Sequence, residues 1–225
     1  MKKLLFITIL MVLGISLLSA NAVALLSSAK GKVELRREAK TIKFRSGDML
    51  LNNDEIRTGG ESFAAYKYID ATTTIKVFSN SFVRISAQKS GNELNKNARV
   101  NSGSVYAKVT SGKGTLTVQT PTSVASVKGT GFMTKVNELG ESMFIVTEGT
   151  VEVSVIDTRE TQSVKAGNTA LVDRDGNLNV RESNDDDLSE LERAEIESSR
   201  TTEPNRMTIP VSDENGTVKY IEITW

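Results

Sequence analysis

Short runs of alternating apolar and polar residues, separated by turn-forming residues, occupy the sequence from about residue 28 to residue 180. The clearest runs lie at residues 33–35, 75–77, 82–85, 105–109, 116–118, 144–146 and 151–155. A period of two places one face of a strand in the core and the other in water. Glycine and Asx residues between the runs supply the turns. The pattern predicts an all-β domain over residues 28–181, which is long enough for a single core.

Three of these runs open with a glycine: Gly31-Lys-Val-Glu-Leu, Gly103-Ser-Val-Tyr-Ala and Gly149-Thr-Val-Glu-Val. A recurring glycine turn before a short strand is typical of a solenoid or a sandwich, in which each rung or hairpin buries one face on its neighbour. Three short matches also arise by chance among strands that begin with glycine. The pattern therefore leaves open a β-solenoid-like domain or a twisted β-sheet.

The chain has no histidine and no cysteine, and this composition excludes most catalytic chemistry. It rules out Cys or His zinc sites, haem ligation by either residue, a Cys nucleophile, a Ser/His/Asp triad and disulfides. The 28 basic residues equal the 28 acidic ones, whereas a nucleic-acid-binding chain normally presents a clearly basic surface. We expect no cofactor, no metal, no catalytic residues and no nucleic-acid partner.

The amino terminus has the pattern of a secretory signal peptide over residues 1–22. Lys2 and Lys3 precede an uncharged run from Leu4 to Leu18, and Ala20-Asn21-Ala22 fits the small-x-small pattern before a signal peptidase cut. The alternative is an uncleaved anchor, because the uncharged run continues to Leu26 and is then long enough to span a bilayer. We expect an exported protein of the periplasm or cell surface, in contact with the membrane only if the segment is retained.

Several segments resemble ligand-binding motifs without meeting their requirements. Gly112-Lys113-Gly114-Thr115 lacks the Walker order, in which Gly-Lys is followed directly by Ser or Thr. Asp173-Arg-Asp-Gly-Asn177 lacks the spaced ligands of an EF-hand and is interpreted as a hairpin turn, with metal binding as the minor alternative. Tyr66 and Tyr68 on one strand face could stack a sugar, although a half-buried strand explains them equally well.

One stretch carries a more specific pattern. Its segments are Leu116-Thr-Val-Gln-Thr120-Pro121, then Val127-Lys-Gly129-Thr130-Gly-Phe132, then Val146-Thr-Glu148-Gly149-Thr-Val-Glu-Val153. This order resembles the signature of the FecR-like domain family, and the resemblance extends over most of residues 28–172. Residue 116 is Leu where the family often has Phe. The resemblance implies a β-solenoid or twisted-sheet domain that works by protein contact, with Thr120, Pro121, Val127, Gly129, Thr130, Phe132, Glu148 and Gly149 in structural roles.

The carboxyl-terminal part changes character. Residues 182–203 hold nine acidic residues against Arg193 and Arg200, and they predict an acidic helix or a linker. Residues 204–225 predict a β-hairpin or tail around Asn215-Gly216, which should dock on something because isolated hairpins are marginal. Residues 23–181 carry 22 basic and 16 acidic residues, so the acidic segment could fold back onto a mildly basic β domain.

The amino-terminal pattern predicts export, and the resemblance to the FecR-like family implies a non-enzymatic module of the cell envelope that works in protein binding, signalling or scaffolding. The partner is expected to be another envelope protein or a cell-wall glycan. Better-known members of the family bind a sigma factor through a cytoplasmic segment. Here only Met1 to Lys3 precede the apolar run, so the expected form is a stand-alone module. The alternative is a peptidoglycan- or polysaccharide-binding module, and a carbohydrate-active enzyme is the weaker alternative.

Overall fold

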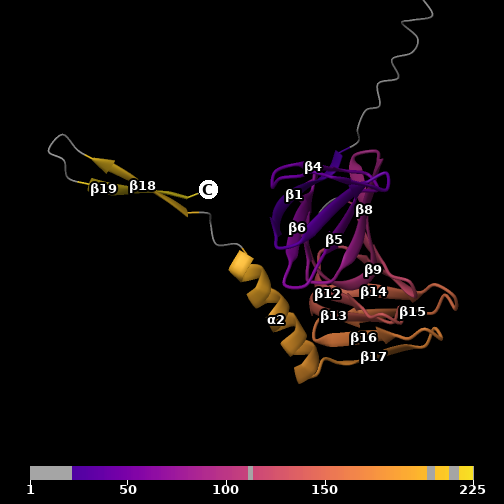
Figure 1. The fold of residues 1–225 in the computed structure, drawn as a ribbon. Helices are drawn as coiled ribbons and strands as arrows, with labels where there is room; N and C mark the ends of the chain where they lie inside the picture. The colour runs from indigo at the N-terminus through magenta and orange to yellow at the C-terminus, as the bar shows by residue number, and fades with distance from the viewer. Residues whose placement is uncertain (1–21, 111–113, 202–205, 213–217, 225) are drawn as a thin grey trace, which may run out of the picture.

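The computed structural model describes residues 22–110, 114–201, 206–212 and 218–224. The chain forms two twisted antiparallel β-layers that share one long strand, with a helix and a separate hairpin after them (Figure 1). The prediction of an all-β domain is confirmed, and of the two forms left open it is the twisted sheet that the chain adopts. The predicted signal peptide lies almost wholly outside the described residues.

Sheet A and sheet B are the names used here for the two layers. Sheet A contains β4 (Met49–Leu51), β1 (Ala22–Lys30), β6 (Phe63–Tyr68), β7 (Thr73–Val77), β12 (Gly131–Val136), β13 (Ser142–Glu148), β16 (Asn168–Val172) and β17 (Leu178–Glu182). Sheet B contains β3 (Lys40–Ile42), β2 (Val33–Arg37), β5 (Glu55–Thr58), β8 (Phe82–Ser90), β10 (Leu116–Gln119), β11 (Ser123–Val127), β14 (Thr150–Val155) and β15 (Thr161–Lys165).

Strand β9 (Glu93–Val109) belongs to both sheets and joins them. Its first half pairs with β8 and, in parallel, with β10 in sheet B. Its second half pairs with β7 and β12 in sheet A. The bend between the halves lies at Gly103, whose φ of 84° an L side chain rarely adopts. One strand thus fixes the position of each layer relative to the other.

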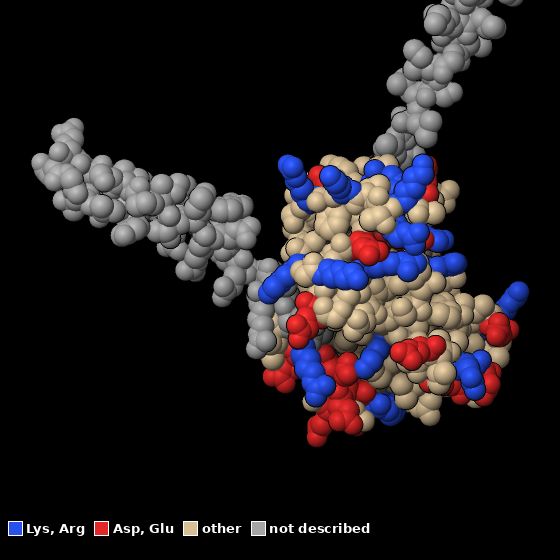
Figure 2. All heavy atoms as spheres, in the orientation of Figure 1, with Lys and Arg blue, Asp and Glu red and all other residues tan. Residues whose placement is uncertain are grey.

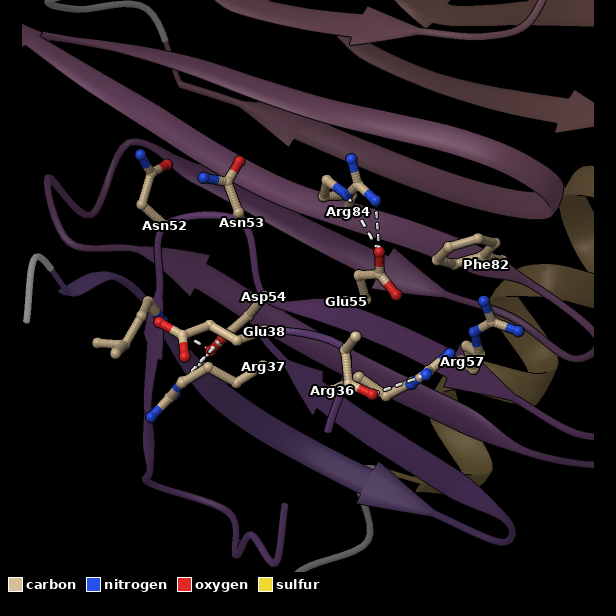
Figure 3. A pocket seen from close by; sticks show the side chains of 12 residues that line it. Arg36, Arg37, Glu38, Asn52, Asn53, Asp54, Glu55, Arg57, Phe82 and Arg84 are labelled. Atoms are coloured by element: carbon tan, nitrogen blue, oxygen red, sulfur yellow. Dashed lines mark hydrogen bonds and ion pairs between the residues drawn. The ribbon is translucent and has the colours of Figure 1, made fainter. Parts of the chain in front are cut away.

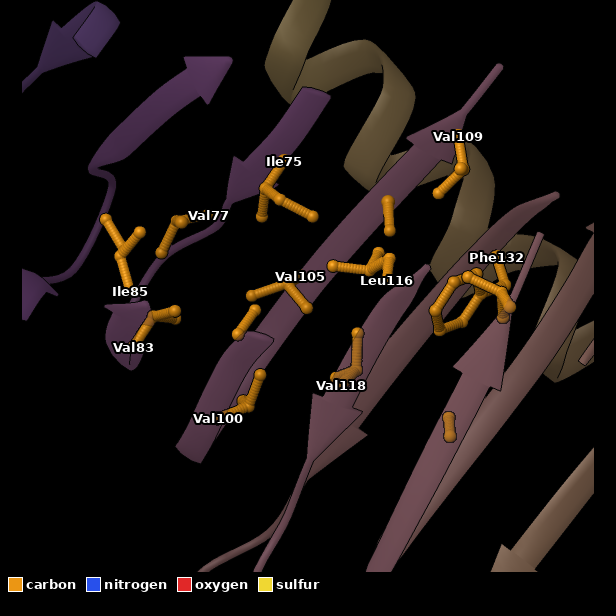
Figure 4. Packing of buried hydrophobic residues seen from close by; sticks show 14 of the residues in the cluster. Ile75, Val77, Val83, Ile85, Val100, Val105, Val109, Leu116, Val118 and Phe132 are labelled. Carbon is orange, nitrogen blue, oxygen red and sulfur yellow. The ribbon is translucent and has the colours of Figure 1, made fainter. Parts of the chain in front are cut away.

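The core lies between the two sheets and is built from the inward positions of their alternating strands. Buried residues of sheet A such as Ile75 and Val105 meet buried residues of sheet B such as Val83 and Val118, and Figure 4 shows this packing. The outward positions of the same strands carry polar residues, as the period of two predicts.

The recurring glycines mark corners where the chain passes from one sheet to the other. Gly31 lies between β1 and β2, and Gly149 lies between β13 and β14; both have positive φ. A Cβ on Gly149 would lie 2.7 Å from the Gly129 carbonyl oxygen, and one on Gly103 would lie 2.7 Å from that of Asn80. At these corners the backbone packs directly on the backbone of a neighbouring turn and leaves no room for a Cβ. This close packing is the common physical reason for the glycine that begins each of the three runs.

The β-structure begins earlier than the predicted boundary at residue 28. Strand β1 starts at Ala22, and its Val23, Ala24 and Leu26 are buried in the core. Residues 23–26, which the anchor alternative assigned to an apolar span, therefore lie in a sheet. Among the described residues, no helix has both the length and the apolar character needed to cross a bilayer.

Helix α2 (Asp185–Thr201) forms within the acidic segment and packs on the outer face of sheet A. The Asn184 side chain accepts a hydrogen bond from the Asp187 amide at 3.0 Å, and the Asp187 carboxylate accepts one from the Asn184 amide at 3.0 Å. This reciprocal capping satisfies amides that the first turn leaves free. Leu191 packs against a second buried cluster on that face, formed by Phe63, Ala65, Phe78, Met133 and Ile145.

The helix is held by charge as well. Glu190 pairs with Lys135 at 2.8 Å, and Asp187 pairs with Arg181 of β17. In Figure 2, acidic side chains gather low in the view where α2 begins, whereas basic side chains lie mainly over the upper half. After the helix, β18 (Arg206–Ser212) and β19 (Val218–Thr224) pair with each other, Ile209 opposite Ile221.

Candidate functional site

The eight motif residues lie in one half of the β domain at turns, corners and core positions. Thr120 and Pro121 form the turn between β10 and β11, and Val127 ends β11. Gly129 and Thr130 form the corner that leads to Phe132 in β12, and Glu148 and Gly149 form the corner between β13 and β14. The two corners touch, but the eight residues line no common pocket. Their placement is what packing requires and offers no reactive cluster.

Thr120 is the centre of a buried hydroxyl cluster. Its Oγ1 lies 2.9 Å from Ser123 Oγ and accepts the Ser123 amide at 3.0 Å. Ser142 Oγ donates to Thr120 Oγ1 at 2.7 Å. These bonds join the β10–β11 turn to the start of β13 and satisfy polar groups that burial would otherwise leave unpaired.

The partner of the Glu148 carboxylate is a lysine. The Glu148 side chain is 62% exposed and forms an ion pair with Lys108, whose pKa is raised because its ammonium group donates a hydrogen bond to the carboxylate. An exposed pair of this kind contributes little to stability. Glu148 is therefore a solvated corner residue, as its sequence context indicated.

Tyr66 and Tyr68 cannot stack a sugar, because both side chains are fully buried in the core. Their rings are packed edge to face with centroids 5.6 Å apart, and burial raises the pKa of each hydroxyl. Tyr68 donates to the Asn97 carbonyl at 2.9 Å. The alternating pattern correctly places both side chains on one face of β6, and that face points into the core.

No group of three His, Cys, Asp or Glu residues is placed to hold a metal ion in the part of the chain that the structure describes. Asp173 uses its carboxylate to close a hairpin turn, accepting the Asp175 and Asn177 amides at 2.9 Å and the Asn177 side chain at 2.7 Å. The bonds from Asn177 lower the pKa of Asp173. The segment is thus built as a turn.

A groove lies on the outer face of sheet B, and we call it the arginine groove (Figure 3). Its volume is about 590 Å³, and its walls come from β2, the β2–β3 turn, the β4–β5 turn, β5 and β8. The lining residues are Arg36, Arg37, Glu38, Ala39, Leu51, Asn52, Asn53, Asp54, Glu55, Arg57, Phe82 and Arg84. Register brings them together, since Arg36 lies opposite Glu55, and Glu55 lies opposite Arg84.

Two of the four arginines are neutralised by carboxylates. Arg37 donates to both oxygens of the buried Asp54, at 2.8 and 2.7 Å, and these hydrogen bonds raise the pKa of Arg37. Arg84 donates to Glu55 Oε1 at 2.6 Å. The Leu51 amide also donates to Asp54, at 2.8 Å, so this carboxylate organises the groove floor.

The other two arginines have no carboxylate partner within the described part of the chain. The Arg57 guanidinium lies 4.0 Å from the centroid of the Phe82 ring, and its buried Nε has no hydrogen-bond partner among the described residues. Arg36 donates to the Ala39 carbonyl at 2.8 Å. Stacking on an aromatic face holds a guanidinium in place without neutralising it. The groove therefore presents free positive charge in a fixed orientation.

Local sequence motifs do not reveal this groove, because its residues belong to three strands and two turns that are far apart in the chain. Arg36, Glu55 and Arg84 occupy outward positions of alternating runs, so each looks like ordinary strand exposure, and Glu38 and Asp54 lie in turns. The only available signal was that Arg36, Arg57, Arg84 and Arg99 all occupy such positions. Their meeting depends on the order β2–β5–β8–β9, which alternation does not reveal.

Comparison with known proteins gives one family and one fold. Residues 54–152 match the family model described as FecR protein. No curated protein sequence matches the chain. Two crystal structures, each described as that of "a putative anti-sigma factor" from Parabacteroides distasonis ATCC 8503, share the fold at 14% sequence identity.

One of these matches has a TM-score of 0.50 and covers 60% of this chain, which spans only 62% of that protein. The other has a TM-score of 0.52 and covers 76% of this chain and 84% of its own. The matched residues 54–152 run from the groove floor at Asp54 through Arg57, Phe82 and the whole corner motif to β14. Within this chain, residues 54–152 therefore match the FecR family model.

Proposed function

We propose that this chain is an exported, non-enzymatic module of the cell envelope that binds a partner protein in signalling or scaffolding. The FecR domain and the description of the two similar structures support a regulatory role. The observation that carries the proposal is the stacked, unneutralised guanidinium of Arg57 on Phe82 in an open groove. Arginine and aromatic residues are enriched at the centres of protein interfaces, where they supply most of the binding energy.

Export is supported by the way the sheet begins. A cut after Ala22 would leave Val23, the first buried residue of β1, at the amino terminus, so the mature chain would retain every core residue. Retention of the apolar run instead would place a membrane segment directly against the edge of sheet A. N-terminal sequencing of protein from the periplasmic fraction should find Val23 as the first residue.

The binding proposal is tested by photo-crosslinking in intact cells. A benzoyl-phenylalanine at position 99, an exposed site on β9 opposite Arg84, should yield a discrete protein adduct. The same residue at position 174, an exposed hairpin turn in the other half of the domain, is the matched control and should not yield it. Arg57→Ala should remove the adduct at position 99, with Arg174→Ala as the paired control.

The glycan-binding alternative gives a different result in the same preparation. If the mature chain co-sediments with purified peptidoglycan and yields no protein adduct, the module binds the wall and the protein-binding proposal is wrong. The burial of Tyr66 and Tyr68 weighs against the alternative, since it removes the aromatic platform on which a sugar could stack.

A further inference from the structure

We propose that the arginine groove recognises a single carboxylate on an extended acidic segment of the partner protein. This inference rests on the proposed function, because it names the chemistry of the partner at the same site. The carboxylate would be held by the Arg57 guanidinium over Phe82, with Arg36 beside it.

The groove carries a net positive charge, and only some of its arginines are paired with carboxylates. Four arginines and three carboxylates line it, and two of the arginines are consumed by Asp54 and Glu55. Arg36 and Arg57 remain without an ion pair among the described residues, and Glu38 is the single remaining carboxylate. An incoming anion would therefore meet one net positive charge and two free donors.

The orientation of Arg57 is fixed before any ligand arrives. Its guanidinium rests on the Phe82 ring, and its buried Nε lacks a hydrogen-bond partner in the described structure. A guanidinium in this state presents a planar fork that matches the two oxygens of a carboxylate.

The rim of the groove is a turn that the chain holds in an unfavourable conformation. Glu38 and Ala39 have φ values of 49° and 63°, a left-handed region that non-glycine residues rarely adopt. The Arg36 side chain donates to the Ala39 carbonyl across this turn. Positive φ at both residues is what a two-residue hairpin turn requires, and Arg37 pairs with Lys40 on either side of it. The hydrogen bond to Ala39 therefore holds the Arg36 side chain against a turn of fixed shape.

The groove also has donors and acceptors suited to a peptide backbone. Asn52 and Asn53 lie on one wall, and both are exposed (Figure 3). Asn52 Oδ1 already accepts the Ala87 amide at 3.0 Å, which fixes the side chain and leaves its amide NH₂ for a ligand. Side-chain amides of this kind pair with peptide carbonyls flanking a carboxylate.

The remaining carboxylates select against anions of higher charge. The groove also carries Glu38, Asp54 and Glu55, and like charges at short range disfavour a phosphate or a polyanionic glycan. A lone carboxylate flanked by neutral peptide groups avoids this repulsion. The volume of about 590 Å³ lies within the range of small-ligand sites and accommodates a short segment of chain.

The test uses the mature full-length chain labelled with ¹⁵N and two five-residue probes, acetyl-Gly-Gly-Glu-Gly-Gly-amide and its Gln isostere. The Glu peptide should shift the amide signals of residues 36–39, 52–57 and 82–84, with an affinity about tenfold above that of the Gln peptide. Equal affinities, or shifts confined to other residues, would overturn the inference.

Two variants test whether binding depends on the planar geometry of the guanidinium or on its positive charge alone. Arg57→Lys retains the charge but not the planar guanidinium, and Phe82→Leu removes the stacking surface. Each variant should bind the Glu peptide roughly fivefold to tenfold more weakly than the native chain does. Arg174→Lys is the matched control and should leave affinity unchanged. Because each variant's amide spectrum reports its fold directly, an unfolded variant is recognised, and Arg36→Lys then replaces it in the same comparison.

A third arm distinguishes the source of the carboxylate and separates this inference from the proposed function. An N-acetylmuramyl peptide that binds more tightly than the Glu peptide assigns the groove to the wall and overturns the protein source. If the native chain yields the position 99 adduct but binds the Glu and Gln peptides equally, the protein-binding function stands and the carboxylate inference is wrong. If the native chain yields no adduct and also binds the two peptides equally, both proposals are refuted.

Discussion

The ammonium group of Lys96 lies 2.5 Å from the Asp70 carboxylate, at the end of a side chain that is completely buried between the two sheets. Lys96 belongs to the sheet B half of β9, whereas Asp70 lies in the turn after β6 of sheet A. Thr72 Oγ1 accepts a second hydrogen bond from Lys96 at 3.0 Å. This buried pair therefore ties the two layers together at one end of the core.

Breaking this pair should be costly. Lys96→Met removes the charge and leaves the Asp70 carboxylate, itself mostly buried, without its main partner, so we expect a loss of about 3 kcal/mol in the free energy of unfolding. Lys89→Met, at an exposed position of β8, is the control and should change stability by less than about 0.5 kcal/mol. Urea unfolding of the mature chain measures both.

The double variant Lys96→Met with Asp70→Asn sharpens this prediction. Because both charges are removed, we expect it to be more stable than Lys96→Met alone. If the double variant loses the sum of the two single effects, the groups do not interact and the assigned pairing is wrong.

Most strands could be predicted from the sequence, because alternation reports burial of one face. The run at residues 82–85 is a clear example, with Val83 and Ile85 buried and Arg84 exposed. Strand β1 was missed at its start, because residues 22–26 continue the uncharged amino-terminal run and show no alternation. The corner glycines were recognised as turns, but their stacking depends on strands that are distant in sequence.

The site was much less predictable than the fold. Lys96 looks like a solvated strand residue until its partner, 26 residues away in the chain, is brought beside it. The arginine groove has the same origin, since Arg57 meets Phe82 only because β5 pairs with β8. Local patterns determine which face a residue occupies, whereas long-range pairing determines its neighbours.

The docking of helix α2 should depend on pH. Burial of Asp187 opposes its ionisation, but hydrogen bonds from Arg181, Asn184 and Thr169 outweigh burial and leave its pKa below the usual 3.8. A lowered folded pKa stabilises the docked state above pH 3.8, and this stabilisation is lost as the pH falls through the lowered value. The protection factors of the amides of residues 185–193, which correct for the slower intrinsic exchange in acid, should therefore fall below about pH 4.

Asp187→Asn should reproduce this release at neutral pH. The substitution removes the charge that pairs with Arg181, and we expect the docked helix to lose about 2 kcal/mol. Asp186→Asn, one residue earlier and exposed, is the control and should leave exchange rates within about twofold of the native chain. Equal exchange in the two variants would show that Asp187 does not hold the helix.

The hydroxyl cluster around Thr120 should contribute to stability through hydrogen bonding and not through volume. Thr120→Val has nearly the same shape but leaves Ser142 Oγ and the Ser123 amide without their acceptor, so we expect a loss of about 2 kcal/mol. Thr117→Val, at a half-buried outward position of β10, is the control. The midpoints of urea unfolding compare the two variants with the native chain. A native-like midpoint for Thr120→Val would contradict the stabilising role of the cluster.

The stacked corners predict different costs for the same substitution at two glycines. Gly149→Ala and Gly167→Ala both place a Cβ on a residue with positive φ, at 77° and 82°, and both pay about 1 kcal/mol for it. Only at Gly149 does the new Cβ meet backbone, 2.7 Å from the Gly129 oxygen, which should raise the cost to about 3 kcal/mol. At Gly167 no atom lies within 4 Å. Thermal and urea unfolding of the two variants measure the difference. Equal losses in the free energy of unfolding would mean that the corner at Gly149 accommodates the added methyl group without cost.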